Sequence, residues 1–265
     1  MIMDTPTGLP TLAGMGVLLT QPRARAEAFA RRLAARGARP FIFPGIVLAE
    51  PTDARGFDAC VGRLDTYDMV VFVSPSAVEA AMPAFRASRP EWPGATRVAA
   101  VGQGTAGALR AYGIDDVLAP ASSSGAAALL ALPALRAAPP KRALIVRGEG
   151  GRDDLAQGLA ELGSQTDHAE CFRRVRPNAD STELLRAWRA GGVDVVVVTS
   201  VEILDNLTAM LGQEGAALLR STPLVTHHPR IADAARAKGF AVVVEADADG
   251  DGIIVALERQ WRHHD

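Results

Sequence analysis

The chain of 265 residues is long enough for one large domain or two of ordinary size, and its 48% apolar and 22% charged residues are typical of a globular protein, which excludes intrinsic disorder. The 28 Lys and Arg residues against 30 Asp and Glu give a net charge of -2, which argues against a general nucleic-acid or membrane-surface binder. Cys60 and Cys171 stand far apart and outside any CxxC arrangement, so neither a disulfide framework nor a zinc site is expected. Because the N-terminus carries no basic region and no apolar run approaches the ~20 residues that span a bilayer, we expect a cytoplasmic protein.

Short β-branched runs alternate with helical patterns along the chain. Helical patterns over 23–36, 105–112 and 153–162 each end at a glycine (Gly37, Gly113 and Gly163), the usual residue just beyond a helix end. A further helix is expected to begin at Ser74 or Ser76. Apolar runs predict strands over 17–20, 69–73, 98–101, 144–146, 193–198, 224–226 and 241–244. Strands that are apolar on both faces and alternate with helices predict an α/β fold with parallel sheets covered by helices.

The chain also aligns with itself, without a gap, at an offset of 126 residues. Ser74 falls on Ser200, and Gly113 falls on Gly239. We therefore expect a duplication, with two similar α/β lobes and a cleft between them, and a superposition of the lobes should place these pairs together. The segments 44–51 and 170–177 hold equivalent places and are predicted to be extended connectors, because a residue before proline is disfavoured in the helical region.

A GxGxxG pattern occurs at 102–107, between a predicted strand and a predicted helix, as a dinucleotide site requires. The acidic residue that would bind the ribose is missing, because Asp115 and Asp116 come before the next strand rather than after it. We interpret the pattern as a tight turn whose free N–H groups face the cleft. A nicotinamide or flavin site is the alternative.

The segment 247–258 has the spacing of an EF-hand calcium loop, with its pattern residues at Asp247, Asp249, Asp251, Gly252 and Glu258. An EF-hand also needs an entering helix, and the run at 241–244 predicts a strand instead. We interpret the segment as an acidic turn that caps the last helix, with calcium binding as the alternative. The adjacent His227 and His228 have no third ligand at a suitable spacing, so no metal or other cofactor is expected.

The segment 147–152, Arg-Gly-Glu-Gly-Gly-Arg, follows a predicted buried strand and leads at once into a helix. Its glycines permit close approach of the backbone to a ligand, and the free N–H groups of a helix N-terminus favour an anion. Arg147 and Arg152 add guanidinium groups, which bind carboxylates and phosphates bidentately. The alternative has Arg152 in solvent and Arg147 paired with a neighbouring carboxylate.

Together these segments resemble the uroporphyrinogen-III synthase family over about residues 16–257. The resemblance rests on the order and spacing of 17–22 (Val-Leu-Leu-Thr-Gln-Pro), 67–74, 100–106, 147–152 and 197–200. It implies two lobes joined by a two-stranded connector, with 1–43 and 177–265 in one lobe, 51–169 in the other, and 44–50 and 170–176 as connectors. It also implies cyclisation of hydroxymethylbilane, a linear tetrapyrrole with eight carboxylates, with inversion of ring D and without metal or cofactor.

The implied site holds the substrate carboxylates with helix N-termini, hydroxyl groups and arginines, so that a flexible chain is kept in one reactive geometry. Most of the candidates lie at or near the carboxyl ends of predicted parallel strands, where ligands of such sheets bind. The candidate substrate-binding residues are Thr20, Arg23, Ser74, Ser76, Gly102, Thr105, Arg147, Gly151, Arg152, Thr199, Ser200 and Arg230.

Two positions depart from the family's pattern. Gln21 stands where the family usually has arginine, and Phe172 stands where it usually has a tyrosine proposed to assist loss of the hydroxyl group. Two candidates for the proton donor therefore remain, a bound water and another side chain. A catalytically weakened family member and a non-enzymatic two-lobed protein that binds an anion or a tetrapyrrole are the alternative functions. We further expect a monomer that contacts hydroxymethylbilane synthase transiently and binds neither nucleic acid nor membrane.

Overall fold

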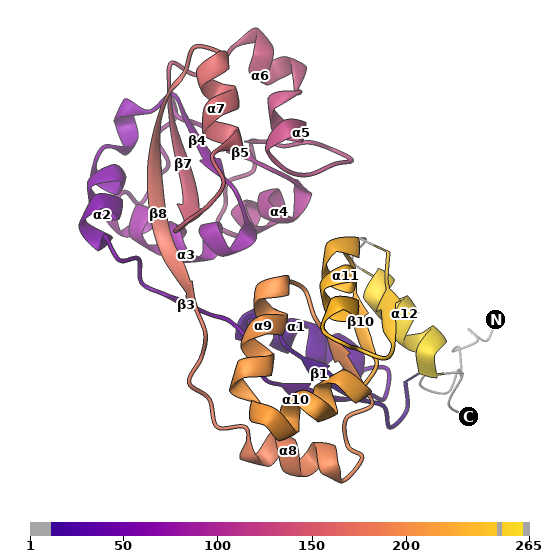
Figure 1. Ribbon diagram of the computed structural model, residues 1–265. Coiled ribbons are helices and arrows are strands. Elements are labelled where there is room, and N and C mark those ends of the chain that lie inside the picture. The colour runs from indigo at the N-terminus through magenta and orange to yellow at the C-terminus, as the bar shows by residue number, and fades with distance from the viewer. Residues whose placement is uncertain (1–11, 248–250, 262–265) are drawn as a thin grey trace, which may run out of the picture. The chain divides into compact units, whose positions relative to one another are not determined.

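The computed structural model describes residues 12–247 and 251–261, with side chains described as far as residue 259 (Figure 1). The chain forms two compact units. Unit 1 consists of residues up to 47 together with those from 175 onward, and unit 2 consists of residues 48–174. The chain passes from one unit to the other inside the two segments interpreted as connectors. Within the described residues, no helix is long and apolar enough to cross a membrane.

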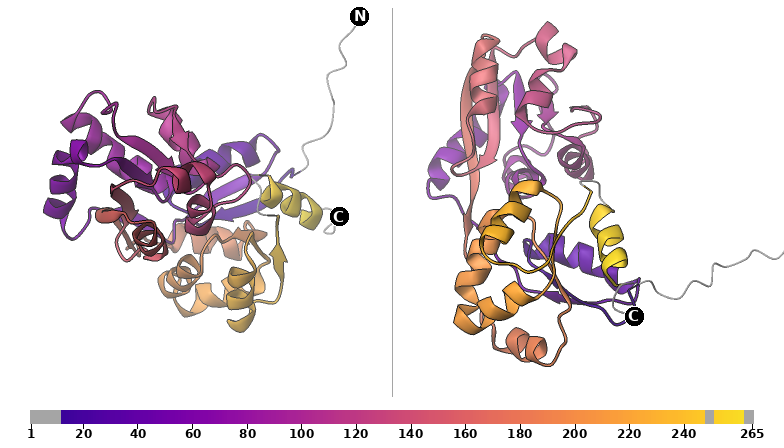
Figure 2. Two further views of the ribbon diagram at one scale, coloured as in Figure 1. Left: turned by 90° about the horizontal axis from the view of Figure 1, so that it is seen from above. Right: turned by 45° about the vertical axis from the view of Figure 1, so that its right-hand side comes forward.

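Unit 1 contains a five-stranded sheet between two layers of helices. Its elements are β1 (Gly16–Leu19), α1 (Arg23–Ala34), β2 (Arg39–Ile42), α8 (Thr182–Arg189), β9 (Val195–Val197), α9 (Val201–Met210), α10 (Gly212–Ser221), β10 (Leu224–Thr226), α11 (Pro229–Ala237), β11 (Val243–Glu245) and α12 (Gly252–Trp261). The strand order is β11-β10-β9-β1-β2, and every pairing is parallel. Leu33 of α1 and Leu257 of α12 pack with Val17 and Val197 on one face. Figure 2 shows α9 and α10 on the other side of the sheet from α1.

Unit 2 contains a six-stranded sheet, also between helices. Its elements are β3 (Val47–Ala49), α2 (Ala54–Gly62), the short 3-10 helix η1 (Leu64–Thr66), β4 (Met69–Phe72), α3 (Pro75–Ser88), β5 (Arg97–Ala100), α4 (Gln103–Ala111), β6 (Val117–Leu118), α5 (Ala126–Leu130), α6 (Pro133–Ala137), β7 (Arg142–Gly148), α7 (Asp154–Glu161) and β8 (Gln165–Val175). The strand order is β3-β8-β7-β4-β5-β6, and the pairings from β8 to β6 are parallel. Because successive strand residues point to opposite faces, Val70 packs in the cluster with α2, α3 and α4, whereas Val71 packs in the cluster with α5 and α7. The expected parallel sheets covered by helices are confirmed.

The hydrogen-bond registers of the two sheets correspond at the offset of 126 residues that the sequence shows. The pair Val17–Val195 between β1 and β9 has its equivalent in Ala143–Met69 between β7 and β4. The other shared pairings keep the same offset, so β2-β1-β9-β10-β11 in unit 1 corresponds to β8-β7-β4-β5-β6 in unit 2. Unit 1 therefore takes its first two strands from the N-terminal part of the chain and its other three from the C-terminal part.

The ends of equivalent helices correspond as well. Ser74 and Ser200 cap α3 and α9, and each hydroxyl oxygen accepts a hydrogen bond of 3.1 Å from the N–H group three residues on. Gly113 and Gly239, which follow α4 and α11, have φ angles of +75° and +83°, a region that favours glycine. The two units thus have equivalent residues at the ends of their helices, as well as equivalent strand pairings.

Candidate functional site

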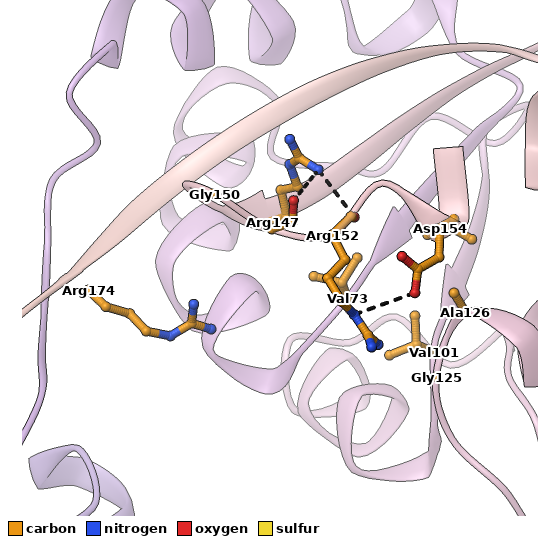
Figure 3. Close-up of a pocket in the computed structure, with 11 residues that line it drawn as sticks. Val73, Val101, Gly125, Ala126, Arg147, Gly150, Arg152, Asp154 and Arg174 are labelled. Carbon is orange, nitrogen blue, oxygen red and sulfur yellow. Dashed lines mark hydrogen bonds and ion pairs between the residues drawn. The ribbon is translucent and has the colours of Figure 1, made fainter. Parts of the chain in front are cut away.

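A pocket of about 320 Å³ with three arginines in its lining opens at the carboxyl ends of three strands of unit 2, β4, β5 and β7 (Figure 3). Ligands of open parallel sheets bind at this end, because the loops that leave the strands and the N-termini of the following helices meet there. The lining residues are Val73, Val101, Gly125, Ala126, Arg147, Gly150, Gly151, Arg152, Asp154, Leu155 and Arg174. Arg147, Gly151 and Arg152 are candidates from the sequence, and the structure brings all three to this pocket.

Arg147, the buried side chain at the end of β7, holds the pocket loop in place. Its Nη1 donates to the carbonyl oxygens of Gly151 at 3.1 Å and Arg152 at 3.3 Å, and to Asp153 Oδ1 at 2.7 Å. Its Nη2 lies 3.1 Å from Glu170 Oε1. The guanidinium is thus paired with two carboxylates, which is the alternative that the sequence left open for this residue. Arg147 shapes the pocket through the loop over 149–153.

The loop itself has the backbone that an anion site requires. Gly150 has a φ angle of +66°, and a Cβ on Gly151 would stand 2.9 Å from Arg147 Cδ, so the chain passes close to the arginine stem. The Asp153 carboxylate does not cap α7, because it accepts from Arg147 instead. That hydrogen bond, followed by the charge of Arg147, lowers the pKa of Asp153. The first N–H groups of α7 therefore have no side-chain partner and can bind a carboxylate.

The two remaining arginines of the pocket differ in their surroundings. Arg152 is 82% exposed, and its Nε lies 3.4 Å from Asp154 Oδ2, an ion pair of small energetic weight in solvent. Arg174, at the end of β8, lies with its guanidinium carbon 5.4 Å from the centre of the Phe172 ring. No carboxylate pairs with Arg174 among the residues that the structure describes, and it has none of the dashed contacts drawn in Figure 3.

Phe172 is buried beside this pocket by an irregularity in the β7–β8 ladder. Arg147 pairs with Glu170 and Gly148 pairs with Phe172, so Cys171 is left as an extra residue on β8. Ala169, Cys171 and Phe172 consequently all pack in one core cluster, which strict alternation along a strand would forbid. Burial raises the pKa of the Cys171 thiol to about 12, so this cysteine stays protonated. The ring of Phe172 is part of the wall behind the pocket loop and carries no hydroxyl group.

Unit 1 has a pocket of about 350 Å³ beyond the ends of β9 and β10, the equivalents of β4 and β5. Three sequence candidates line it, Thr199, Ser200 and Arg230. His227 also lines it, and its buried Nδ1 has no hydrogen-bond partner among the described residues. Burial, and to a lesser extent His228, lowers the pKa of His227, so its imidazole is neutral at pH 7. His228 Nδ1 accepts from Arg230 N at 3.1 Å and caps α11.

The other sequence candidates lie outside these two pockets. The Thr20 hydroxyl is fully buried and donates to the Val197 carbonyl at 2.6 Å, so its one proton ties β1 to β9. Arg23 is exposed and lies 3.6 Å from Glu27 on α1.

Ser76 and Thr105 are buried in α3 and α4, and Gly102 caps α4 with its backbone packed on Ser124. Ser74 caps α3, and no acceptor for its hydroxyl proton occurs among the described residues.

The two motifs with alternative interpretations have the surroundings expected from the sequence. The GxGxxG segment follows β5 and forms the N-cap and first residues of α4, and Asp115 and Asp116 precede β6. The strand β11 precedes Asp247, and Asp251 and Glu258 form ion pairs with Arg32 and Arg36 of α1. Asp249 lies outside the described residues. In the described part of the chain, no three His, Cys, Asp or Glu side chains are placed to hold a metal ion.

These pockets occur in a chain that a family model matches over most of its length. The model described as uroporphyrinogen-III synthase HemD matches residues 27–254. The chain belongs to the uroporphyrinogen-III synthase family. It is 35% identical over 250 residues to the uroporphyrinogen-III synthase of Salmonella typhimurium, with 92% of this chain and 100% of the relative covered. It is 31% identical over 247 residues to that of Escherichia coli, again with 92% and 100% covered.

Solved structures of uroporphyrinogen III synthases share the fold. A mutant of the Thermus thermophilus protein aligns with a TM-score of 0.57 at 18% identity, covering 94% of this chain and 99% of that chain. The Helicobacter pylori protein aligns with a TM-score of 0.55 at 12% identity, covering 91% and 97%. The resemblance that the sequence motifs suggest is therefore confirmed at the level of family and fold.

Arg174 and His227 line these pockets but are not among the sequence candidates. Arg174 belongs to a segment that the sequence shows only as a connector, so nothing places its side chain at the end of a sheet strand. His227 enters the sequence interpretation only as a metal ligand. The signal that could have found both is the rule that side chains just beyond the carboxyl ends of parallel strands meet in space.

Proposed function

We propose that the chain converts hydroxymethylbilane to uroporphyrinogen III, closing the linear tetrapyrrole with inversion of ring D and release of one water molecule. The reaction is a lyase step of tetrapyrrole biosynthesis and uses no metal or cofactor. The observation that carries the proposal is the family match over residues 27–254, which includes both pockets. Relatives that carry the name uroporphyrinogen-III synthase align along 92% of this chain.

The chemistry of the pockets supports a reaction controlled by substrate orientation. The substrate carboxylates keep their charge throughout the reaction, so groups that bind them fix its conformation and do not take part in bond making. In unit 2 these groups are Arg152, Arg174 and the uncapped N–H groups of α7. In unit 1 they are Thr199, Ser200 and Arg230. Because the linear substrate also cyclises unaided, to the type I isomer, holding one geometry is the enzyme's main task.

Phe172 cannot donate the proton that leaves with the hydroxyl group. A phenylalanine has no ionisable proton, so the proton that leaves with the hydroxyl group comes from water or from another side chain. We propose that Phe172 acts as a wall of the site. The specific observation that favours a catalytically weakened member as the second candidate is this missing hydroxyl, together with Gln21, whose buried Oε1 has no partner among the described residues.

The cellular setting follows from the same proposal. Cys60 and Cys171 are both buried and unpaired, which fits a reducing compartment. The cytoplasmic location, the monomeric state, the transient contact with hydroxymethylbilane synthase and the cleft between the lobes stay predictions.

The test couples an enzymatic supply of hydroxymethylbilane to chromatographic separation of the type I and type III isomers. The proposed synthase gives mainly isomer III, and its amount rises with the amount of protein added. A binding protein without activity leaves the isomer ratio as it is without protein. A weakened member gives isomer III at a rate that barely competes with spontaneous closure to isomer I.

A further inference from the structure

We propose that Arg174 is a substrate-carboxylate-binding residue of the unit 2 pocket, and that the Phe172 ring is the positioning residue that holds its guanidinium there. The proposal deepens the function proposed above and rests on it. It assigns a role to an arginine that no sequence motif indicates, and it gives the phenylalanine a role that needs no proton.

Arg174 is the pocket arginine left free for a ligand among the described residues. Arg147 already donates to Asp153 and to backbone carbonyls, and it pairs with Glu170. Arg152 lies 3.4 Å from Asp154. Arg174 lines the same pocket, and within the described residues no carboxylate or carbonyl oxygen accepts from it. A guanidinium with open donors at the edge of a pocket is the group expected to bind a carboxylate bidentately.

The ring of Phe172 orients this guanidinium. The two residues are two apart on β8, and the guanidinium carbon lies 5.4 Å from the ring centre, within the range of a cation–π contact. The ring itself is 2% exposed and rests against Gly148, so it cannot turn away. A fixed aromatic face limits the freedom of a long exposed side chain and so lowers the entropy lost when a ligand binds.

The neighbouring arginine shows that this placement is specific to Arg174. Arg173 is also exposed, and its Nε donates to the Glu50 carbonyl at 3.1 Å. It does not line the pocket. Arg173 therefore offers a matched control with the same charge, on the same strand, one residue away.

The kinetic test compares Arg174→Gln with Arg173→Gln in the coupled isomer assay. A carboxylate keeps its charge from substrate to transition state, so its partner contributes equally to both, and losing it raises KM with little change in kcat. We expect Arg174→Gln to raise KM for hydroxymethylbilane by about fivefold or more, a typical effect of losing a charge-assisted hydrogen bond. Arg174→Lys restores only part of the loss, because an ammonium cannot bind bidentately. Equal KM values for Arg174→Gln and Arg173→Gln would overturn the proposal.

The positioning role is tested by substitutions at Phe172 combined with Arg174→Gln. Phe172→Leu keeps an apolar side chain and removes the ring face, so we expect KM to rise by about two- to fivefold. Phe172→Tyr keeps the face and leaves KM unchanged. In the double variant Phe172→Leu/Arg174→Gln the effects are not additive, and its KM equals that of Arg174→Gln alone. Additive effects would show that Phe172 acts only on packing and would refute the positioning role.

A binding measurement separates this proposal from the proposed function. Fluorescence titration with uroporphyrin III, a stable macrocycle with eight carboxylates, gives Kd without turnover. We expect Arg174→Gln to weaken Kd by about fivefold or more while Arg173→Gln leaves it unchanged. That result with an inactive wild-type protein would leave the carboxylate site standing and refute the synthase function. Wild-type binding that is absent, or that is indifferent to Arg174, would refute the site itself.

Discussion

The ring of Phe172 lies so close to the backbone of Gly148, its partner across the β7–β8 ladder, that a Cβ on Gly148 would stand 2.5 Å from Phe172 Cε2. The glycine is therefore required by the phenylalanine ring, while its own φ angle is not in the left-handed region. This contact lies at the register shift that precedes the pocket loop. The packing of one ring thus fixes where the loop leaves the sheet.

Gly148→Ala is expected to lower the free energy of unfolding by about 1–3 kcal/mol, because the new methyl group overpacks against a ring that has no room to move. The matched control is Gly62→Ala near the end of α2, where a Cβ meets nothing within 4 Å. That control should be neutral or stabilising by up to about 1 kcal/mol. Urea denaturation measures both variants. Equal stability of Gly148→Ala and the wild type would contradict the described contact.

Arg147→Met should loosen the pocket loop, because the methionine makes none of the five contacts of the guanidinium to the loop and to Glu170. The carboxylates left behind are partly exposed and can be hydrated, so we expect a loss of only about 1–3 kcal/mol in the free energy of unfolding. Limited proteolysis should cut faster within 149–153. The control Arg142→Gln, on the same strand, removes a half-exposed ion pair with Asp167 and should cost about 1 kcal/mol or less. A variant at Arg147 that is no less stable than this control would exclude the clamping role.

Stability should fall as the solution is acidified below neutral pH, and His168 is one cause. Burial, followed by the charge of Arg147, lowers the pKa of His168 below its ordinary 6.5. Below that value the unfolded chain binds a proton that the folded protein does not, so the free energy of unfolding falls with decreasing pH until the folded pKa is passed. His168→Gln should flatten the dependence between about pH 7 and pH 5, and His227, whose pKa is lowered as well, leaves a residual slope. Urea midpoints across this range check the difference, and parallel curves for the two proteins would refute it.

Removal of divalent cations should leave both activity and stability unchanged. Of the residues with EF-hand spacing, Asp251 and Glu258 form ion pairs with Arg32 and Arg36, and a strand precedes the segment. The measurement is isomer III formation and the melting temperature with and without a calcium chelator. Activity that collapses on chelation and returns with calcium would restore the alternative interpretation of 247–258.

The sequence predicts the central strands of both sheets because these strands are buried on both faces and read as continuous apolar runs. The sequence predicts no strand over the first half of Gln165–Val175, because polar residues such as Asp167 and His168 interrupt the apolar pattern, and it indicates only a connector over the second half. The strand character of this segment comes from its pairing with β7, which is a tertiary contact. The extra residue Cys171, which turns Phe172 into the core, leaves no signal in the local pattern.

The candidate site, like the fold, is predicted from the sequence only in part. Gly151 and Arg152 could be placed at the pocket because they follow a predicted strand directly. The partners of Arg147 could not be chosen from the sequence, since Glu170 is 23 residues away and Asp153 is equally suited to cap α7. Thr20 is a candidate through its position after a strand, and only the register with β9 shows that its proton is already used.

We propose that this chain directs ring closure by holding its substrate, with no proton from position 172. The most direct measurement is the ratio of isomer III to isomer I formed by the wild type, Phe172→Tyr and Phe172→Ala, beside their melting temperatures. We expect the wild type to form mainly isomer III and Phe172→Tyr to be equal or faster, with any gain below the roughly 10²–10⁴-fold that a positioned acid can give. Phe172→Ala should lose about 3–5 kcal/mol of stability and much of its activity, because the buried ring is removed. Isomer I alone from the wild type, together with isomer III from Phe172→Tyr, would contradict the account and make this chain a disabled member of its family.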